Sequence, residues 1–414
     1  APGRSVTPRA PLGPAPRHSS SARASLSVVG TASALAILAG WNASNVGGVA
    51  DPLAAAYGVG LPTVGVLITA LLVVHSLAQI PAGGWTDRLG ARRAGWLAVG
   101  ILLVCNLAAC ATPSFGLALA ARTCMGLGTA LAFLAGSSFL RLAGDSSLAQ
   151  GWLGGMGIGG GGLAIAIVPR AVPVLSWRAP YATALVVCLL ALGCLALAPS
   201  ARPAAGTPAT GVRALVSLGN PLLRRLAVIH MGSMGVAMVA SSWAVPFLTR
   251  KGYGLGQASL AASLILLVGV VSRPLGGWLQ RRRPEWTRGL VLCSVGLSAV
   301  GMVLVVGPAG LSLPVLGSAL LGLATGLPFG LVFNEAAVAR PERPTAAVGF
   351  VNMFGNVGVV VATPLLGLAF LIRGGAGAGF LALAGLGLAS ALVLPRLTVP
   401  ASAGEKVPAG LRWR

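Results

Sequence analysis

Apolar residues occur in twelve long stretches separated by short polar segments. Each stretch holds about 20 residues or more, which lets a helix cross the hydrocarbon core of a bilayer. The stretches are apolar on all sides and rich in Gly, Ala and Leu, as in packed membrane helices, and the short alternating segments of a strand barrel are absent. The predicted spans are 26–49, 61–85, 94–112, 114–140, 148–169, 179–199, 223–249, 257–280, 289–307, 311–334, 346–371 and 375–396.

The twelve stretches form two similar halves. The segment GGWTDRLGARR begins at Gly83, and a degraded copy, GGWLQRRRPE, begins at Gly276, each two residues after a proline. Such a repeat predicts an all-α membrane protein with twelve transmembrane helices in two pseudo-symmetric six-helix bundles and a substrate site between them. The bundles are expected at 25–199 and 223–396, joined by a cytoplasmic linker at 200–222, with a disordered cytoplasmic tail at 1–24 and a second tail at 397–414.

Composition and charge agree with this architecture. Hydrophobic residues make up 56% of the 414 positions and charged residues 9%, whereas an ordinary soluble domain has about 25% charged residues. The net charge of +22 comes mostly from Arg and Lys on segments that share one side, which predicts a protein of the plasma (inner) membrane with both termini cytoplasmic. Nucleic acid is excluded as a partner because no basic soluble domain is present.

Several function classes lack the residues that they need. The six cysteines lie inside predicted spans and indicate neither a disulfide framework nor a metal site. No Ser, His and Asp set, paired carboxylates or metal-ligand cluster has usable spacing, so an enzyme is not expected. We expect no cofactor, a small-molecule substrate, the lipid bilayer as surroundings, and a monomer.

The first copy of the repeat matches every fixed position of G-x-x-x-D-[RK]-x-G-x-[RK]-[RK]. The matching residues are Gly83, Asp87, Arg88, Gly90, Arg92 and Arg93. This pattern resembles the loop between helices 2 and 3 of the major facilitator superfamily, and Arg122-x-x-x-Gly126-x-Gly128 is similar to its helix-4 signature. The resemblance implies alternating access and a gating role for the loop, although in the second copy Gln280 replaces Asp87. The alternative is that these arginines only fix the topology.

Two arginines, Arg122 and Arg273, are predicted inside the membrane without a carboxylate nearby in sequence. An intramembrane cation is costly and suggests a function. Arg122 is a candidate for scaffolding or coupling. Arg273 precedes Pro274, where a helix bends, and a guanidinium suits a planar anion; a salt bridge or a lipid-facing position is the alternative. No acidic residue lies at mid-membrane, so a coupled proton would bind His75 or His230, unless these histidines only pack.

Other polar residues and glycines complete the candidate set. His75 and Gln79 share one helix face, as do Asn352 and Asn356, and Asn42 and Asn45 are added as substrate-binding candidates of the first span. Two glycine triplets repeat the same spacing in the fifth and eleventh spans, where close helix packing is the ordinary explanation. The triplets are Gly151, Gly157 and Gly160, and Gly349, Gly355 and Gly358.

The run from Ser272 to Gly277, the glycine triplets and Trp243-x-x-Pro246 resemble the nitrate/nitrite porters and cyanate-type relatives within the superfamily. Those porters carry a second arginine near the position of Gln79, so an organic carboxylate is also a candidate substrate. We expect a secondary transporter of a small anion, with a proton or a counter-transported anion. The alternatives are an efflux carrier for hydrophobic or drug-like compounds and a non-transporting membrane sensor of the same fold.

Overall fold

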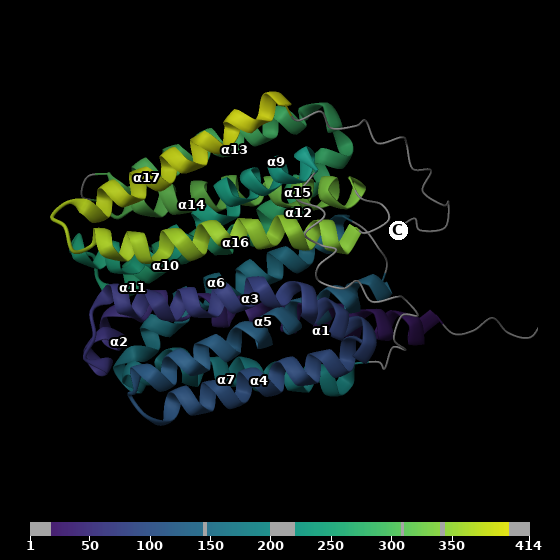
Figure 1. Ribbon diagram of the computed structural model, residues 1–414, viewed down its shortest axis with the longest axis horizontal. Helices are drawn as coiled ribbons and strands as arrows, with labels where there is room; N and C mark the ends of the chain where they lie inside the picture. The colour runs from purple at the N-terminus through teal and green to yellow at the C-terminus, as the bar shows by residue number, and fades with distance from the viewer. Residues whose placement is uncertain (1–17, 144–146, 199–219, 308–309, 340–343, 397–414) are drawn as a thin grey trace, which may run out of the picture.

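The computed structural model describes residues 18–143, 147–198, 220–307, 310–339 and 344–396 (Figure 1). Residues 1–17 of the predicted tail, 200–219 of the linker and the whole of 397–414 lie outside these residues, whereas 18–24 already belong to the first helix and 220–222 lead into the first helix of the second half. The first half of the chain contains α1 (His18–Ser44), η1 (Gly47–Val49), α2 (Ala50–Tyr57), α3 (Leu61–Leu89), α4 (Ala91–Ala111), α5 (Phe115–Ala143), α6 (Ser147–Leu175), η2 (Ser176–Arg178) and α7 (Ala179–Leu197).

The second half is also helical, and no strand occurs among the described residues. It contains α9 (Pro221–His230), the π-helical turn η4 (Met231–Gly235), α10 (Val236–Arg250), α11 (Leu255–Leu267), α12 (Gly269–Arg282), η5 (Pro284–Trp286), α13 (Thr287–Val306), α14 (Ser312–Gly326), α15 (Pro328–Val338), α16 (Pro344–Ala369), α17 (Gly375–Ser390) and η6 (Ala391–Arg396). Pro274 lies inside α12, and the break in this span falls earlier, at Val268 between α11 and α12.

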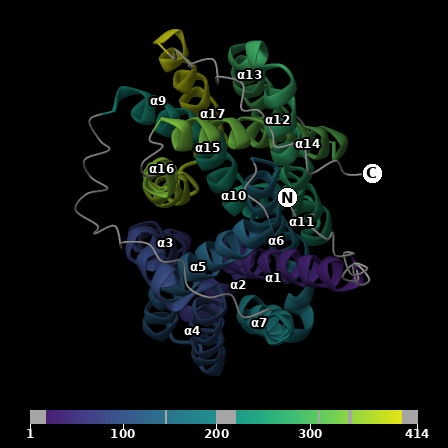
Figure 2. The same ribbon diagram turned by 90° about the vertical axis from the view of Figure 1, so that its right-hand side faces the viewer.

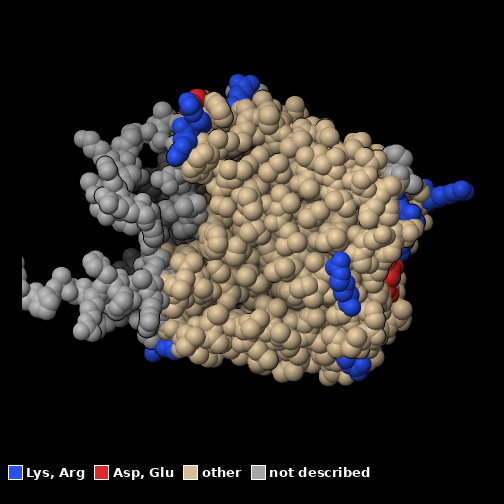
Figure 3. All heavy atoms as spheres, turned by 180° about the vertical axis from the view of Figure 1, so that it is seen from behind, with Lys and Arg blue, Asp and Glu red and all other residues tan. Residues whose placement is uncertain are grey.

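The described helices make a multi-pass membrane protein. Among the described residues, eleven helical runs are long and apolar enough to cross a membrane, and one of them, Gly151–Leu197, is 47 residues long and contains most of α6 and all of α7. Counted separately, α6 and α7 bring the crossings to the twelve that the sequence predicts. Large apolar side chains such as Leu77, Val104 and Val271 are exposed on the outside. Figure 3 shows a broad face of uncharged residues with charged side chains mainly toward its ends, as a lipid-facing surface requires.

The helices pack as two groups. In the first, α1 contacts α5, α6 and α7, while α3 and α4 contact α5; in the second, α13 contacts α14 and α17, and α11 contacts α10 and α14 (Figure 2). The groups meet along two seams, in which α3 packs against α16, and α6 packs against α11 and α12. A substrate site that belongs to both halves therefore has to lie between these seams.

Glycine determines the turn between α3 and α4. Gly90 has φ 81° and ψ 154°, a backbone conformation that side chains disfavour, and its N–H donates to the carbonyl of Thr86 at 2.9 Å. The fixed glycine of the loop pattern thus has a local structural reason. We refer to the end of the helices that carries this turn as the Gly90 end, and to the end that carries α2 as the α2 end.

The two groups of helices are in contact at the α2 end. A Cβ atom at Gly47 in η1 would overlap the carbonyl oxygen of Ser242 in α10, so the two backbones touch. Asp51 of α2 accepts a hydrogen bond from Arg250 of α10 at 3.0 Å. Toward the Gly90 end of the α3–α16 seam, the Cβ positions of Gly83 and Gly349 have no atom within 4 Å. The structure is therefore closed at the α2 end.

Candidate functional site

A cavity with a volume of about 110 Å³ lies between the two groups of helices. Its walls come from α1, α3, α5 and α6 on one side and from η4, α10, α11, α12, α15 and α16 on the other. Most of the lining is apolar or glycine. The longer polar side chains in the walls are His75, Arg273, Asn352 and Asn356. Four residues that the sequence singled out separately are thus brought to one cavity.

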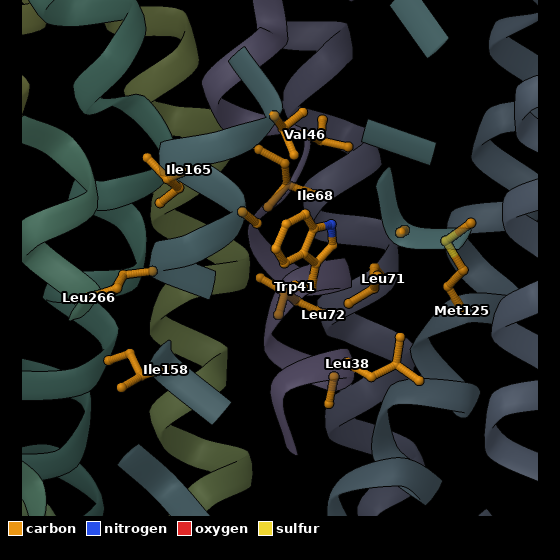
Figure 4. Close-up of a cluster of buried hydrophobic side chains, with 14 of the residues drawn as sticks. Leu38, Trp41, Val46, Ile68, Leu71, Leu72, Met125, Ile158, Ile165 and Leu266 are labelled. Carbon is orange, nitrogen blue, oxygen red and sulfur yellow. The ribbon is translucent and has the colours of Figure 1, made fainter. Parts of the chain in front are cut away.

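Apolar side chains pack around Trp41 of α1 beside the cavity. Figure 4 shows Trp41 among Ile68, Leu71 and Leu72 of α3, with Ile158 of α6 and Leu266 of α11 nearby. Leu72, Ile158 and Leu266 also line the cavity. This packing surrounds the polar groups with a medium of low polarity, in which electrostatic interactions are stronger than in water.

Arg273 is the charged group of the cavity. Its residue exposure is 5%, and its Nη1 donates to the carbonyl oxygen of Gly154 in α6 at 2.8 Å. Its guanidinium carbon lies 4.0 Å from the centre of the Phe329 ring, a cation–π contact. The Nε atom is buried without a hydrogen-bond partner, and no carboxylate pairs with Arg273 within the described residues. Arg273 thus keeps hydrogen-bonding capacity and a positive charge for a further group.

An aromatic cluster stands behind Arg273. The rings of Phe329 and Phe333 are stacked with centres 4.4 Å apart, and the His230 ring lies 5.8 Å and 5.1 Å from them. His230 is fully buried, and its Nε2 is 3.4 Å from Oδ1 of Asn352. His230 therefore lies behind the cavity wall and contacts two residues of that wall, Phe329 and Asn352.

His75 occupies the opposite wall in a short chain of polar side chains. Its Nδ1 is 2.9 Å from Oγ1 of Thr129 in α5, and its Nε2 is 2.8 Å from Nε2 of Gln79. Gln79 is buried and does not line the cavity, whereas His75 is partly exposed in its wall. The shared helix face of His75 and Gln79 thus produces a direct contact between them.

Arg122 belongs to a different polar cluster. It is fully buried; its Nε donates to the carbonyl oxygen of Leu67 at 3.1 Å, and its Nη1 donates to the carbonyl oxygen of Asn42 at 2.6 Å and to Oδ1 of Asn45 at 3.0 Å. Asn42 also accepts from Nδ2 of Asn106 at 2.9 Å. Asn42, Asn45 and Arg122 do not line the cavity. These contacts join α1, α3, α4 and α5 inside the first group of helices.

The two glycine triplets have different surroundings. Gly157 and Gly160 let α6 touch α1, because Cβ atoms at Gly40 and Gly160 would overlap the carbonyl oxygens of Gly157 and Ile37. Gly355 and Gly358 instead make room for the side chains of His230 and Met231. Gly151 packs on Pro274 of α12, and Gly349 has no neighbour within 4 Å of its Cβ position. One repeated pattern therefore serves backbone contact in α6 and side-chain insertion in α16.

The residues of the Gly90 loop lie away from the cavity. Arg92 donates from Nε to Leu195 and from Nη2 to Ala196, both at 3.3 Å, so it caps the carbonyl end of α7 within the same group of helices. Arg88 and Arg93 are exposed, and the side chain of Asp87 lies outside the described residues. Gly83 has open space at its Cβ position. Gating by these six residues stays a prediction.

Sequence reasoning missed several lining or supporting residues: Phe133, Thr129, Met234, Met238 and Phe329. All except Thr129 are apolar residues in apolar spans, so nothing in their spacing separates a cavity residue from a packed one. Thr129 follows directly after Gly128 of the helix-4 pattern, and that position was the only available signal. Among the described residues, no group of three or more His, Cys, Asp or Glu could hold a metal ion.

Comparisons with known proteins agree with this architecture. Over 346 residues, the chain is 25% identical to the nitrite extrusion protein of Bacillus subtilis (strain 168), covering 78% of this chain and 82% of that protein. The crystal structure of a D-xylose-proton symporter superposes with a TM-score of 0.70 at 13% identity, covering 89% of this chain and 97% of that chain, which is a likeness of fold. A family model of the Major Facilitator Superfamily matches residues 32–338, and the chain therefore belongs to this superfamily.

Proposed function

We propose that this secondary transporter carries a small anion of the nitrate, nitrite, cyanate or small carboxylate type by alternating access. The superfamily supports the transporter class. The substrate would bind in the cavity between the bundles at 25–199 and 223–396. The Gly90 end would face the cytoplasm of a cell whose plasma membrane holds the protein, as the distribution of Arg and Lys favours.

Arg273 carries the proposal. An unneutralised guanidinium in a membrane interior is costly, and the described carboxylates have other partners: Asp51 pairs with Arg250, Glu285 with Arg283, and Glu335 with Gln280. A bound anion would neutralise this charge and accept hydrogen bonds from the unused N–H groups of the guanidinium. The planar guanidinium matches the geometry of carboxylates and similar oxyanions. Asn352 and Asn356 would add neutral donors from α16.

The cavity size favours a small solute. Pockets for drug-sized ligands usually have volumes of about 300–1,000 Å³, against about 110 Å³ here. The similarity to a nitrite extrusion protein, at 25% identity, supports an anion as the substrate. Nitrate porters place a second arginine near the position of Gln79. With one arginine in place of two, an anion that needs weaker binding, such as an organic carboxylate, is as good a candidate substrate as nitrate.

Alternating access would require the contacts at the α2 end to open. The Asp51–Arg250 pair and the Gly47–Ser242 contact join the two groups of helices there. Rocking of one bundle against the other around the cavity would break these contacts and expose Arg273 to the opposite side. The Gly90 loop would then close the cytoplasmic side.

The second candidate is efflux of hydrophobic or drug-like compounds, for which a hydrophobic cation serves as the probe. It is favoured by the two methionines in the cavity wall, Met234 and Met238, because thioether side chains adapt to varied apolar ligands. Arg273 acts against it, since a cationic wall repels a cationic ligand.

Thermal stability of the purified protein tests the proposal. A ligand present at 100 times its Kd stabilises the native state by about 2.7 kcal/mol. The ligand panel would be nitrite, nitrate, cyanate, formate, acetate and tetraphenylphosphonium. We expect stabilisation by at least one anion, loss of that shift in Arg273→Met and a smaller shift in Arg273→Lys, which keeps the charge without the planar fork.

Arg282→Met is the matched control. Arg282 lies on the same helix, is exposed, and stacks over Trp278 at 4.7 Å, so its loss should leave the anion shift unchanged. Stabilisation by tetraphenylphosphonium alone, equal in wild type and Arg273→Met, would favour the efflux candidate. An anion shift that survives in Arg273→Met would refute the assigned role of Arg273.

A further inference from the structure

The hydrogen bonds around His75 indicate which tautomer of the imidazole fits the structure. Thr129 donates its hydroxyl hydrogen to the carbonyl oxygen of Gly126 at 3.0 Å. Its Oγ1 is therefore an acceptor for His75, 2.9 Å away, and His75 carries its hydrogen on Nδ1. The other ring nitrogen, Nε2, then accepts from the amide nitrogen of Gln79 at 2.8 Å. This arrangement fits a neutral imidazole whose basic lone pair, at Nε2, accepts from Gln79 and is the position that can take a proton.

Protonation of Nε2 would make the contact with Gln79 repulsive. The new N–H would point at the amide nitrogen of Gln79, and two donors cannot bond to each other. Rotation of the Gln79 amide by about half a turn would present its oxygen and restore the bond, at the cost of moving a buried side chain. The orientation of the Gln79 amide would therefore depend on whether His75 holds a proton.

Only one of the two intramembrane histidines can exchange protons through the cavity. His75 is partly exposed and lines it, whereas His230 is fully buried behind Asn352, Phe329 and Phe333. A proton on His75 would come from water in the cavity, when that cavity is open to either side, and would return to water by the same route.

Few other charges act on His75. α3 packs against α1, α2, α4, α5 and α16, and the described part of α16 has no ionisable residue. The ionisable side chains of α5 nearest to Thr129 are Arg122, about two turns toward the α2 end and engaged by three acceptors, and the outward-facing Cys124. The other groups with described side chains are Asp51 and Tyr57 at the α2 end, Arg88, Arg92 and Arg93 at the Gly90 end, and Cys105 and Cys110 in α4. Across the cavity stands Arg273.

We propose that His75 is the proton site of this transporter and that the anion and the proton bind the cavity together. The inference rests on the proposed anion substrate. With Arg273 charged, the empty cavity and the cavity loaded with one monovalent anion and one proton carry the same net charge. An anion between Arg273 and the protonated His75 would offset their mutual repulsion, so each ligand would raise the affinity for the other. Both loaded and empty forms would then cross between states with equal charge.

The test combines anion binding with direct observation of the histidines. The chain has three histidines, so labelling with [15N]histidine gives three imidazoles, and His75→Asn assigns one of them. We expect the His75 signals to report an Nδ1–H neutral ring at high pH and protonation on acidification, with the midpoint moving to higher pH when nitrate is added. Nitrate is a suitable probe because its own charge is constant.

Binding should change with pH in parallel. The apparent Kd for nitrate should rise by up to about tenfold per pH unit above the midpoint in wild type, and this slope should disappear in His75→Asn. Gln79→Glu, whose carboxylate accepts the Nε2–H, should move the midpoint to higher pH. Ser76→Ala is the matched control on the same helix, because Ser76 bonds only to its own backbone at Leu72.

The outcomes separate the two proposals. If no anion of the panel binds at any pH, the proposed substrate is wrong, and the titration of His75 without anion still decides whether His75 is a proton site. If His75 stays neutral from pH 5 to pH 8 with saturating nitrate, or if His75→Asn keeps the wild-type pH slope, the assignment of His75 is overturned.

Discussion

Replacing Asn45 by alanine should destabilise the protein more than replacing Asn42, although both asparagines lie three residues apart near one end of α1. Asn45 accepts from the Arg122 guanidinium at 3.0 Å and donates to the carbonyl of Pro180 at 2.8 Å. The side chain of Asn42 accepts from Asn106 at 2.9 Å, and its bond to Arg122 uses the backbone carbonyl, which alanine keeps. The two variants therefore differ in whether a buried cation loses an acceptor.

The magnitudes follow from these contacts. Hydrogen bonds between neutral side chains of membrane helices contribute about 0.6 kcal/mol on average and about 1.7 at most, so Asn42→Ala should cost about 0.6 kcal/mol. A bond to a charged group contributes about 1.5–3 kcal/mol. Asn45→Ala also leaves the Pro180 carbonyl without this donor, and its total cost should be about 2 kcal/mol or more. Arg122 retains Leu67 and the Asn42 backbone as acceptors, which limits the loss.

Reversible unfolding of both variants in mixed micelles measures this difference, with anion binding to the folded protein as a second readout. We expect the anion affinity to stay at the wild-type value in both, because neither asparagine lines the cavity. Equal unfolding free energies for the two variants would refute the reasoning about the buried cation. A loss of anion binding without a loss of stability would return Asn45 to the substrate site.

Two further predictions concern contacts between helices. Gly40→Ala should lower the free energy of unfolding by at least about 1–3 kcal/mol, or prevent folding, because a Cβ atom would overlap the Gly157 carbonyl. Gly30→Ala, which has open space on the same helix, should be neutral in the same unfolding assay. Equal yields and stabilities of the two variants would contradict the close contact. Asp51→Asn should shift the population toward the form open at the α2 end by a factor of roughly 1.4–5, since a half-exposed pair contributes about 0.2–1 kcal/mol. The distance between spin labels at Ala55 and Gln257, in a cysteine-free background, would measure that shift. Glu285→Gln is the control: it removes the Arg283–Glu285 pair, which lies inside one group of helices, and should leave the distance unchanged.

The sequence alone determined the class and the layout of the protein. Uniformly apolar stretches predict spans because a bilayer requires a fixed length of apolar helix, and the repeated loop predicted two similar halves. The need for glycine at position 90 could be predicted because it depends on the local backbone conformation, with φ 81°. The intramembrane position of Arg273 could also be predicted, because a charged residue inside an apolar stretch is evident from the sequence whichever way its side chain points.

Only the tertiary structure decided which polar residues share a site. A span that is apolar on all sides has no pattern that says which face meets the cavity, so Asn42, Asn45 and Asn352 were equivalent candidates in the sequence. The packing of α1 against α3 and α5 directs Asn42 and Asn45 to Arg122, while α16 directs Asn352 to the cavity. Phe329 belongs to the site because its ring stacks against the guanidinium of Arg273. Such juxtapositions depend on contacts between residues far apart in the chain, and the hydrophobic pattern of a single helix does not encode them.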